Sequence, residues 1–421
     1  MNAPTSIKSS RLIDATPFFY GWVILAVGTI SIIMMGPSQT FTVGIFTDYF
    51  ITELNITRAN ISLIYGLATL GGSLLLPITG KLVDRYGPQR MVLVAALTLG
   101  LACIDMALVH GVVSIFIGFL ALRFAGFGSL QLVSNNVVAQ WFIRRRGLVM
   151  GLAGQSLAVS LIVYPSLAEY LINRFDWRSA YVVLGLLVWI IVLPLGWFFV
   201  KDKPELYGLL PDGDQQTISP GSRPYISEEN WTLEEARRTS AFWIFAAALA
   251  TMTMLMAGLI FHQLSLFEQR GLSREAAILA FNAIAIASIA GNFGMGYLLD
   301  NYSARLLLAL TLSLLVGALI LVQVMTTPGQ ALLYGVLLGL SSGAYKVIDS
   351  VIWAKYYGRL HLGSIKGATM LGLVGASAFG PYPLGLSLDY LGSYAPVLTG
   401  LLILPVSIGF ASLLIKRPEK R

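Results

Sequence analysis

The chain has 421 residues, of which 56% are hydrophobic and only 12% are charged. Soluble domains carry about 25% charged residues, so this composition excludes a water-soluble protein and indicates many membrane-spanning helices. The net charge of +7 would suit a nucleic-acid partner, but the positions of the basic residues argue against one, as shown below. A single cysteine, Cys103, excludes a disulfide framework, and three histidines without cysteine partners predict no metal site.

Twelve apolar runs are long enough to cross a bilayer as helices. About 20 apolar residues are needed, because in hydrocarbon a helix must satisfy its own backbone hydrogen bonds. We predict spans at 18–46, 60–83, 91–110, 113–139, 148–173, 179–200, 241–267, 276–299, 306–326, 330–354, 367–389 and 395–415. The predicted fold class is an all-α membrane protein with twelve transmembrane helices.

One long polar stretch, residues 201–238, separates six spans from six and holds eight acidic and five basic residues. Within it, Thr232 to Glu235 has a capping-box pattern that predicts a short surface helix. We expect an N-terminal six-helix bundle at 1–200, a cytoplasmic linker at 201–238 and a C-terminal six-helix bundle at 239–421.

The basic residues are distributed unevenly between the loops. If the N-terminus is cytoplasmic, the inner loops and tails hold 21 of the 28 Lys and Arg, the outer loops hold five, and Arg123 and Lys346 lie within spans. This positive-inside bias explains the net charge and predicts cytoplasmic termini, a lipid bilayer as surroundings and no nucleic-acid partner. The compact loops suggest a bacterial inner (plasma) membrane.

The two halves of the chain repeat one another. The matched segments, at offsets of 215 or 216, are 80–86 with 296–302, 141–144 with 356–359, and Pro165 with Pro381. Three matches in the same order predict two pseudo-symmetric six-helix bundles, related by an axis along the membrane normal.

Two motifs resemble those of the major facilitator superfamily. The loop Gly80-x-x-x-Asp84-Arg85-x-Gly87-x-x-Arg90 resembles its signature between helices 2 and 3, and Arg123-x-x-Gly126-x-Gly128 resembles its helix-4 motif. The resemblance covers the whole chain and implies the major facilitator fold and secondary transport. The segments 141–147, 176–178 and 203–213 are similar to the bacterial monocarboxylate and oxalate/formate branch.

The chain departs from the family patterns at three places. Asn301 replaces the Arg expected in the second copy of the loop. Tyr164, not Gly, precedes Pro165, whereas drug antiporters have a Gly-Pro pair in helix 5. The resemblance would also place a substrate cation on helix 8 or 11, and neither span contains one. An anionic substrate would therefore need Lys346 or Arg123.

The loop motif predicts a gate, because charges at helix ends can stabilise one of two states. The alternative is that these residues only determine topology. The expected gating residues are Gly80, Asp84, Arg85, Gly87 and Arg90 in the first copy, and Asp300 and Arg305 in the second.

Arg123 lies near the middle of the fourth span. An Arg at that depth costs about 2.5–3.5 kcal/mol on insertion scales, so it should face a cavity or a counter-charge. It would attract an anion or take part in proton-linked switching, or else hold helices together as a structural contact. Gln131 and Asn135 follow on the same span, and Gln39 follows a Gly36-Pro37 break that should bend the first span.

Lys346 and Asp349 are three residues apart on the tenth span, so they share a face and can pair. We expect Lys346 to hold a carboxylate, with Asp349 setting its charge state and Tyr345 and Ser341 adding hydrogen bonds. The alternative is that Lys346 extends to the cytoplasmic interface.

Asp105 in the third span and Glu169 in the fifth are candidate proton carriers, although hydration or pairing explains them better. His262 is expected as a polar tip at the membrane interface.

These observations favour a secondary transporter, proton-coupled, of a small organic anion such as a monocarboxylate. The first alternative is a drug or neutral-metabolite proton antiporter of the same fold. The second alternative is a receptor or an intramembrane enzyme. No catalytic set of residues in the sequence supports it. No Walker-type motif is present to indicate an ATP-driven pump. No cofactor is expected, the partners are a small-molecule solute and protons, and a monomer is expected.

Overall fold

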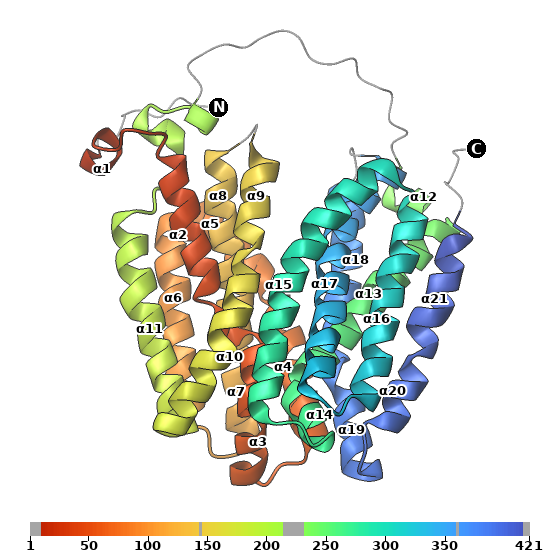
Figure 1. Cartoon of the computed structure of the whole chain (residues 1–421). Coiled ribbons are helices and arrows are strands. Elements are labelled where there is room, and N and C mark those ends of the chain that lie inside the picture. Colours follow the sequence, from red (N-terminus) through yellow and green to blue (C-terminus); the bar gives the residue numbers. More distant parts are fainter. Residues whose placement is uncertain (1–9, 143–144, 214–230, 359–361, 416–421) are drawn as a thin grey trace. The chain divides into compact units, whose positions relative to one another are not determined.

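The computed structural model describes residues 10–142, 145–213, 231–358 and 362–415, and their regular secondary structure is helical (Figure 1). Among these residues, twelve helical segments are long and apolar enough to span a membrane. The segments are Gly21–Leu54, Arg58–Val83, Pro88–Ala107, Val112–Trp141, Leu148–Arg174, Trp177–Phe198, Ser240–Phe261, Arg274–Leu299, Ala304–Val324, Pro328–Tyr357, Ile365–Leu391 and Ala395–Leu413. The twelve predicted spans are therefore confirmed, and the ends of the first and seventh differ most from the prediction.

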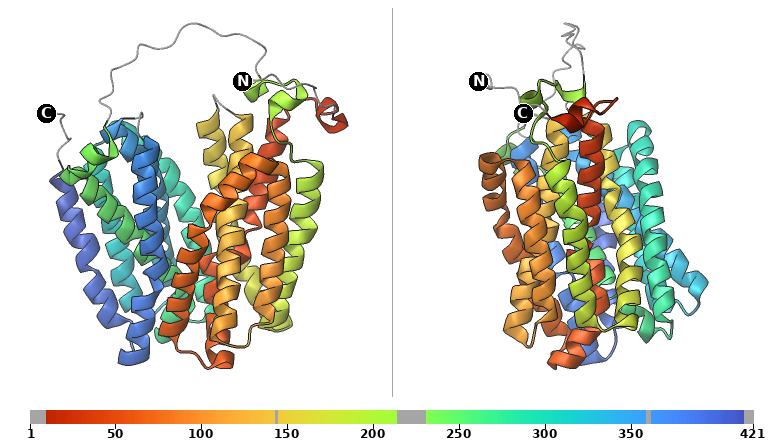
Figure 2. Two further views of the ribbon diagram at one scale, coloured as in Figure 1. Left: turned by 180° about the vertical axis from the view of Figure 1, so that it is seen from behind. Right: turned by 90° about the vertical axis from the view of Figure 1, so that its left-hand side faces the viewer.

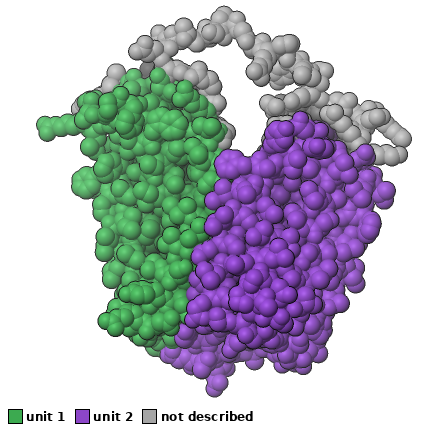
Figure 3. Space-filling model, viewed as in Figure 1, with its two compact units in different colours: residues 1–43, 71–222 green, residues 44–70, 223–421 purple. Residues whose placement is uncertain are grey.

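The chain divides into two compact units, coloured separately in Figure 3. Unit 1 consists of residues 1–43 and 71–222. Its helices, two of which are shared with unit 2, are α1 (Arg11–Asp14), α2 (Gly21–Ile33), η1 (Gly36–Ser38), the start of α3 (Thr40–Leu54), the end of α4 (Arg58–Leu74), α5 (Leu76–Tyr86), α6 (Pro88–Ala107), α7 (Val112–Leu122), η2 (Arg123–Leu130), α8 (Gln131–Trp141), α9 (Arg146–Gly154), α10 (Ser156–Arg174), α11 (Trp177–Phe198), η3 (Pro204–Tyr207) and η4 (Pro211–Gly213).

Unit 2 consists of residues 44–70 and 223–421. Besides most of α3 and α4, it contains α12 (Leu233–Arg237), α13 (Ser240–Phe261), α14 (Gln263–Gln269), α15 (Arg274–Asn301), α16 (Ala304–Val324), α17 (Pro328–Tyr357), α18 (Leu362–Phe379), α19 (Pro381–Leu391), α20 (Ala395–Leu401) and α21 (Ile403–Leu413). Two further views show the long, roughly aligned helices within each unit (Figure 2).

The hairpin of residues 44–70 comes from the first two spans but packs with the C-terminal half of the chain. Asn55 makes its turn with a positive φ of 56°, a conformation that asparagine tolerates better than most residues. The first span extends to Leu54, beyond the predicted end at residue 46. It is longer because residues 47–54 include polar side chains that pack in unit 2, which a search for apolar runs does not detect.

In unit 1, α6 packs against α11 through a glycine. A Cβ on Gly100 would collide with the indole of Trp189, whose Nε1 donates to the Leu97 carbonyl at 3.2 Å. The α11 helix is capped by Asp176, which accepts hydrogen bonds from the amides of Arg178 and Ser179. The Ser179 hydroxyl and amide, as donors, lower the pKa of the Asp176 carboxyl.

The predicted surface helix before the seventh span is present as α12. The Thr232 hydroxyl accepts from the Glu235 amide at 3.3 Å, and the Glu235 carboxylate accepts from the Thr232 amide at 2.7 Å. This reciprocal pair is the capping box that the sequence predicts.

In unit 2, a row of glycines on α17 allows its backbone to approach α15 closely. A Cβ on Gly335 would lie 2.8 Å from the Ala280 carbonyl oxygen, and one on Gly339 would collide with the Ile284 carbonyl. The four-residue spacing places these glycines on one face of α17, which is how membrane helices commonly pack. Gly66 and Gly72 of the second span are also closely packed, whereas a Cβ added to Gly151 would meet no described atom within 4 Å.

We predict that Gly339→Ala destabilises the protein, because its methyl group would press on the α15 backbone rather than on a movable side chain. The cost should be about 1–3 kcal/mol, measured as a lower thermal unfolding temperature in detergent. Gly294→Ala on α15 is the control, since nothing lies within 4 Å of its added Cβ. It should be neutral or stabilising because alanine favours a helix. Equal effects of the two substitutions would contradict this account of the seam.

Candidate functional site

The first span breaks where the sequence predicts. Helix α2 ends at Ile33, the 3₁₀ turn η1 covers Gly36–Ser38, and α3 begins at Thr40. Gly36 lies so close to the Tyr164 ring that a Cβ there would collide with it. The break leaves the Ser38 carbonyl outside a regular helix, so this buried acceptor needs a donor from elsewhere.

Arg123 supplies that donor. Its Nη1 donates to the Ser38 carbonyl at 2.9 Å, and its guanidinium carbon lies 4.0 Å from the centre of the Phe127 ring. The side chain is only 4% exposed. These contacts satisfy the freed Ser38 carbonyl and place the cation over an aromatic face. They match the second role predicted for Arg123, a structural contact that holds two helices together.

The helix-4 motif beginning at Arg123 forms a π-helical segment, η2. Its two glycines allow close packing: a Cβ on Gly126 would collide with Ser38, and one on Gly128 would collide with Leu76. Single π-helical turns often occur at functional sites. The glycines therefore bring η2 against the broken first span, which is what allows Arg123 to reach Ser38.

Three amide side chains of unit 1 remain available for hydrogen bonding. Gln39 is buried, and its side-chain nitrogen has no hydrogen-bond partner among the described residues. Gln131 and Asn135 on α8 are half-buried, and in the described part of the chain neither side chain forms a hydrogen bond. Such groups need solvent or a polar solute.

The predicted residues of the tenth span lie on α17 of unit 2. Lys346 is exposed and has no hydrogen-bond or ion-pair partner among the described residues. Asp349 is half-buried and accepts from the Trp353 indole at 3.1 Å. The expected ion pair between Lys346 and Asp349 is therefore not formed here, because the carboxylate is held by the indole one turn further along the helix.

Two neighbouring groups on α17 have partners within unit 2. The Thr253 hydroxyl of α13 lies 2.9 Å from the Tyr345 hydroxyl and holds that half-buried ring in place. Ser341 is buried and donates to the Thr311 carbonyl at 3.0 Å. The Ser341 hydroxyl therefore bonds to the backbone of α16, and its predicted contact with a solute stays a prediction.

The two candidate proton carriers have different surroundings. The Asp105 carboxylate is half-buried, and its Oδ2 has no hydrogen-bond partner in the described residues. Glu169 is half-buried and accepts from the Asn173 side chain at 3.4 Å. Asp105 therefore remains a candidate for carrying a proton. Glu169 has a hydrogen-bond partner one turn away, as expected if its role is structural.

The loop between the second and third spans turns at Gly87, whose φ of 83° favours glycine. A Cβ there would also lie 2.8 Å from the Asp202 carboxylate. Asp202 Oδ1 accepts from the Gln89 amide at 3.0 Å and so caps the start of α6. Asp202 was not predicted, because nothing in the local sequence links this residue to a loop more than one hundred positions earlier.

The remaining gating residues show few contacts. Arg85, Arg90 and Arg305 are exposed, and the Arg85 guanidinium lies 5.3 Å from the Tyr86 ring centre. Among the described residues, no atom lies within 4 Å of a Cβ added to Gly80. The side chains of Asp84 and Asp300 lie outside the described residues.

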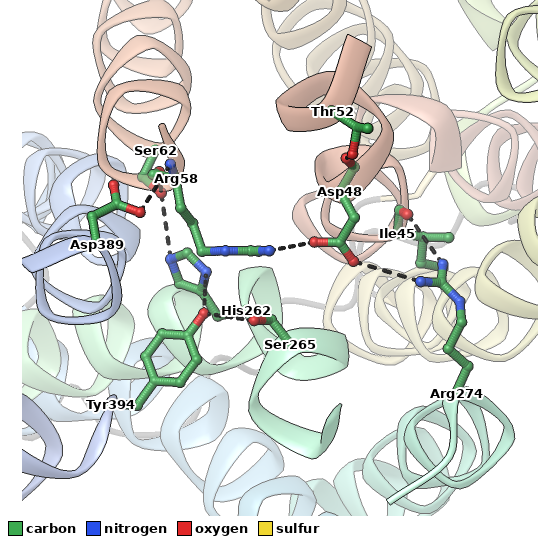
Figure 4. Close-up of polar contacts among 10 residues, drawn as sticks. All are labelled: Ile45, Asp48, Thr52, Arg58, Ser62, His262, Ser265, Arg274, Asp389 and Tyr394. Atoms are coloured by element: carbon green, nitrogen blue, oxygen red, sulfur yellow. Dashed lines mark hydrogen bonds and ion pairs between the residues drawn. The ribbon is translucent and has the colours of Figure 1, made fainter. Parts of the chain in front are cut away.

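A polar cluster in unit 2, shown in Figure 4, was not predicted from the sequence. Asp48 on α3 forms ion pairs with Arg58 at the start of α4 and with Arg274 at the start of α15, the latter at 3.5 Å. The Arg58 side chain is 13% exposed, so this pair is less screened by solvent than an ordinary surface pair. The sequence shows Arg58 and Arg274 only as loop charges.

The start of α4 is capped by a residue far along the chain. Asp389 on α19 accepts from the Ala59 amide at 2.6 Å and from the Arg58 amide at 3.3 Å. The first amides of a helix have no partner within it, and a carboxylate there also interacts favourably with the helix dipole. Asp389 thus fixes the 44–70 hairpin to α19.

His262 lies at the centre of this cluster and is 1% exposed, so it is not the interfacial polar tip that the sequence suggested. Its Nε2 lies 2.8 Å from the Pro381 carbonyl and 3.4 Å from the Ser62 hydroxyl. Its Nδ1 lies 3.3 Å from the Tyr394 hydroxyl, which donates to Ser265 at 3.0 Å. One imidazole thereby joins α4, α19 and the start of α20.

A sequence model of the Major Facilitator Superfamily matches residues 27–381, most of the chain. This chain belongs to the Major Facilitator Superfamily. It is therefore an integral membrane transporter and not an enzyme. Membership agrees with the loop and helix-4 motifs, and it assigns small-molecule solutes as the general class of partner.

Three curated relatives match more distantly. The uncharacterized MFS-type transporter YhjX of Escherichia coli is 24% identical over 66% of this chain and 66% of that protein. Monocarboxylate transporter 2 of Mus musculus is 30% identical over 39% of this chain and 34% of its own length. The probable sulfoacetate transporter SauU of Cupriavidus necator is 22% identical over 81% of each chain. The chain thus spans less than two thirds of the first two relatives.

A solved structure shows the same fold. The crystal structure of a bacterial homologue of the human lysosomal transporter Spinster, in an inward-facing and occupied conformation, matches with a TM-score of 0.69. The identity is 13%, and the match covers 94% of this chain and 95% of that one. The major facilitator fold predicted from the repeat and the motifs is confirmed.

We predict that Arg123→Gln destabilises this transporter by about 1–3 kcal/mol, because the shorter side chain leaves the buried Ser38 carbonyl without its donor. Thermal unfolding in detergent measures the effect. Arg85→Gln removes an exposed guanidinium of the same size and should change the unfolding temperature little. If Arg123→Gln is as stable as Arg85→Gln, the contact with Ser38 does not support the broken span.

We also predict that Asp48→Asn loosens the 44–70 hairpin, since Arg58 and Arg274 both lose their shared counter-charge. A cysteine at buried Ser62 should react slowly with maleimide, and Asp48→Asn should make it react several-fold faster. The native Cys103 is buried and contributes little background. A cysteine at exposed Thr52 is the control and should react rapidly in both backgrounds. An unchanged rate at position 62 would show that the ion pairs do not hold the hairpin.

Proposed function

We propose that this protein is a secondary active transporter that carries a small organic anion, such as a monocarboxylate, together with protons. The observation that carries this proposal is Lys346. Lys346 is an exposed residue of the tenth span, and its ammonium has no hydrogen-bond or ion-pair partner among the described residues.

An unpaired cation within a span is unfavourable. A Lys near the middle of a membrane helix costs about 2.5–3.5 kcal/mol, and such residues usually face a partner or a water-filled path. Asp349 and Lys346 form no ion pair in the described part of the chain, and the Asp349 carboxylate accepts a hydrogen bond from the Trp353 indole instead. A solute carboxylate would supply the missing charge, through a charge-assisted hydrogen bond.

The names of two relatives support an anion. Monocarboxylate transporter 2 and the probable sulfoacetate transporter SauU are both named for solutes that carry a carboxylate. We infer the same class here, with Tyr345 beside Lys346 as a hydrogen-bonding neighbour. In unit 1, the unsatisfied amides of Gln39, Gln131 and Asn135 are suited to contacts with a polar solute.

Proton coupling is assigned to Asp349, with Asp105 as a second candidate. Protonation of Asp349 would remove a negative charge one turn from Lys346 and thereby strengthen the field that an incoming anion meets. Arg123 is assigned to the conformational change, because its hydrogen bond to Ser38 links the fourth span to the break in the first.

The distribution of basic residues bears on the orientation of the protein in the membrane. We infer that both termini and the 201–238 linker are cytoplasmic, in a bacterial plasma membrane, because this orientation puts 21 of the 28 basic residues on the inner side. We also propose that the monomer moves as two halves, 1–200 and 239–421, about the solute.

The function is tested with purified protein in liposomes, by counterflow and pH-driven uptake of labelled lactate, pyruvate and formate. Wild type should accumulate at least one of them when a proton gradient is imposed. Lys346→Met should reduce its uptake about tenfold to a hundredfold, the value of a hydrogen bond to a charged group. Asp349→Asn should shift the pH dependence of uptake and retain solute binding.

Lys355→Met is the matched control, because Lys355 lies on the same helix and its ammonium already donates to the Leu299 carbonyl. It should alter stability more than solute recognition. Near-normal uptake by the double variant Lys346→Met with Asp349→Leu would remove this pair from the site and leave Arg123 as the candidate cation. Export of neutral or cationic compounds without any anion flux would favour the antiporter alternative.

A further inference from the structure

Unit 2 contains a cavity of about 480 Å³ beside α12, α13 and α18, three helices that contact one another (Figure 1). Its lining includes neither Lys346 nor Asp349, so it is separate from the proposed solute site. Its lining includes Arg237, Phe242, Trp243, Ala246, Ala247, Ala250 and Gly372.

Small side chains create this cavity. Ala246, Ala247 and Ala250 lie along one side of α13, and Gly372 faces them from α18 with no atom within 4 Å of an added Cβ. The Phe242 ring, 3% exposed, adds an apolar wall. A channel of methyl groups beside a membrane helix has the chemistry of a hydrocarbon chain.

One end of the cavity is polar. Arg237 is the last residue of α12 and precedes the seventh span, which begins at Ser240. A residue just outside a span is expected at the level of the lipid headgroups. Its side chain is exposed and has no ion-pair or hydrogen-bond partner within the described chain. Arginine binds phosphate well because its guanidinium presents several donors in a planar fork.

Trp243 marks the same depth. Its ring is 59% exposed, and its indole nitrogen donates to the Arg237 carbonyl at 2.8 Å. Tryptophan is enriched at the membrane interface, where an apolar ring and a polar N–H are both accommodated. This bond ties the aromatic wall of the cavity to the residue that carries the cation.

We propose that this cavity binds an anionic phospholipid. The phosphate is held by Arg237, the upper part of one acyl chain lies along Ala246, Ala247 and Ala250, and Trp243 contacts the glycerol region. Positive charge at one end and an apolar channel at the other match a lipid better than a small hydrophilic anion. Basic pockets between membrane helices recognise anionic headgroups in this way. The site adds a lipid ligand to the transporter and does not depend on which solute is carried.

The test uses the full chain in phosphatidylcholine bilayers, with a small fraction of either phosphatidylglycerol or phosphatidylcholine carrying brominated acyl chains. Bromine quenches tryptophan fluorescence on contact, and the share of Trp243 is obtained by comparison with Trp243→Phe. Wild type should show stronger quenching of Trp243 by the anionic lipid. Arg237→Gln should lower that preference about fivefold, the effect of one interfacial basic residue.

Two further variants make the result specific to the cavity. Arg238→Gln removes the adjacent exposed charge, which does not line the cavity, and should retain most of the preference. Ala247→Leu keeps both charges but fills the channel, and should reduce quenching of Trp243 by the brominated anionic lipid. Equal losses in Arg237→Gln and Arg238→Gln would overturn the proposal in favour of diffuse surface charge. Unchanged quenching in a folded Ala247→Leu protein would also overturn it.

Discussion

A backbone carbonyl that leaves a helix inside an apolar bundle must find a donor, and in this protein that donor is Arg123. The 3₁₀ turn at Gly36–Ser38 releases the Ser38 carbonyl, and the guanidinium meets it at 2.9 Å. Without that hydrogen bond, the break in the first span would leave a buried carbonyl without a donor. The π-helical segment, its glycines and the packing of Tyr164 on Gly36 all serve the geometry of this one contact.

In unit 2, backbone groups at the start of a helix likewise find a partner on a distant side chain. The amides of Arg58 and Ala59 have no acceptors within α4, and the Asp389 carboxylate accepts from both. Asp48 then neutralises the Arg58 side chain, and Ser62 contacts His262 one turn further along. Charge and hydrogen bonding therefore hold the 44–70 hairpin against the C-terminal half, although these residues belong to the first two spans. These contacts agree with the place of residues 44–70 in unit 2.

The features that the sequence predicted well are those with a local or periodic signal. Apolar runs located the twelve spans, a capping box located α12, and the Gly36-Pro37 pair located the break. The family motifs indicated the fold. What could not be predicted depends on pairing across the chain: Asp202 with Gln89, Asp389 with Ala59, and His262 with Tyr394. A local signal can also mislead. The spacing of Lys346 and Asp349 permits an ion pair, but it does not reveal that the Trp353 indole bonds to the carboxylate.

The cap on α4 joins residues that are synthesised at very different times. The ribosome adds Asp389 more than three hundred residues after Arg58. While the N-terminal spans enter the membrane, the Arg58 and Ala59 amides therefore lack their native acceptor, whereas the Asn60 amide already has the neighbouring Thr57 hydroxyl. The hairpin acquires its final partners when the eleventh span is in place, so the end that joins the first two spans is among the last parts of the protein to become native.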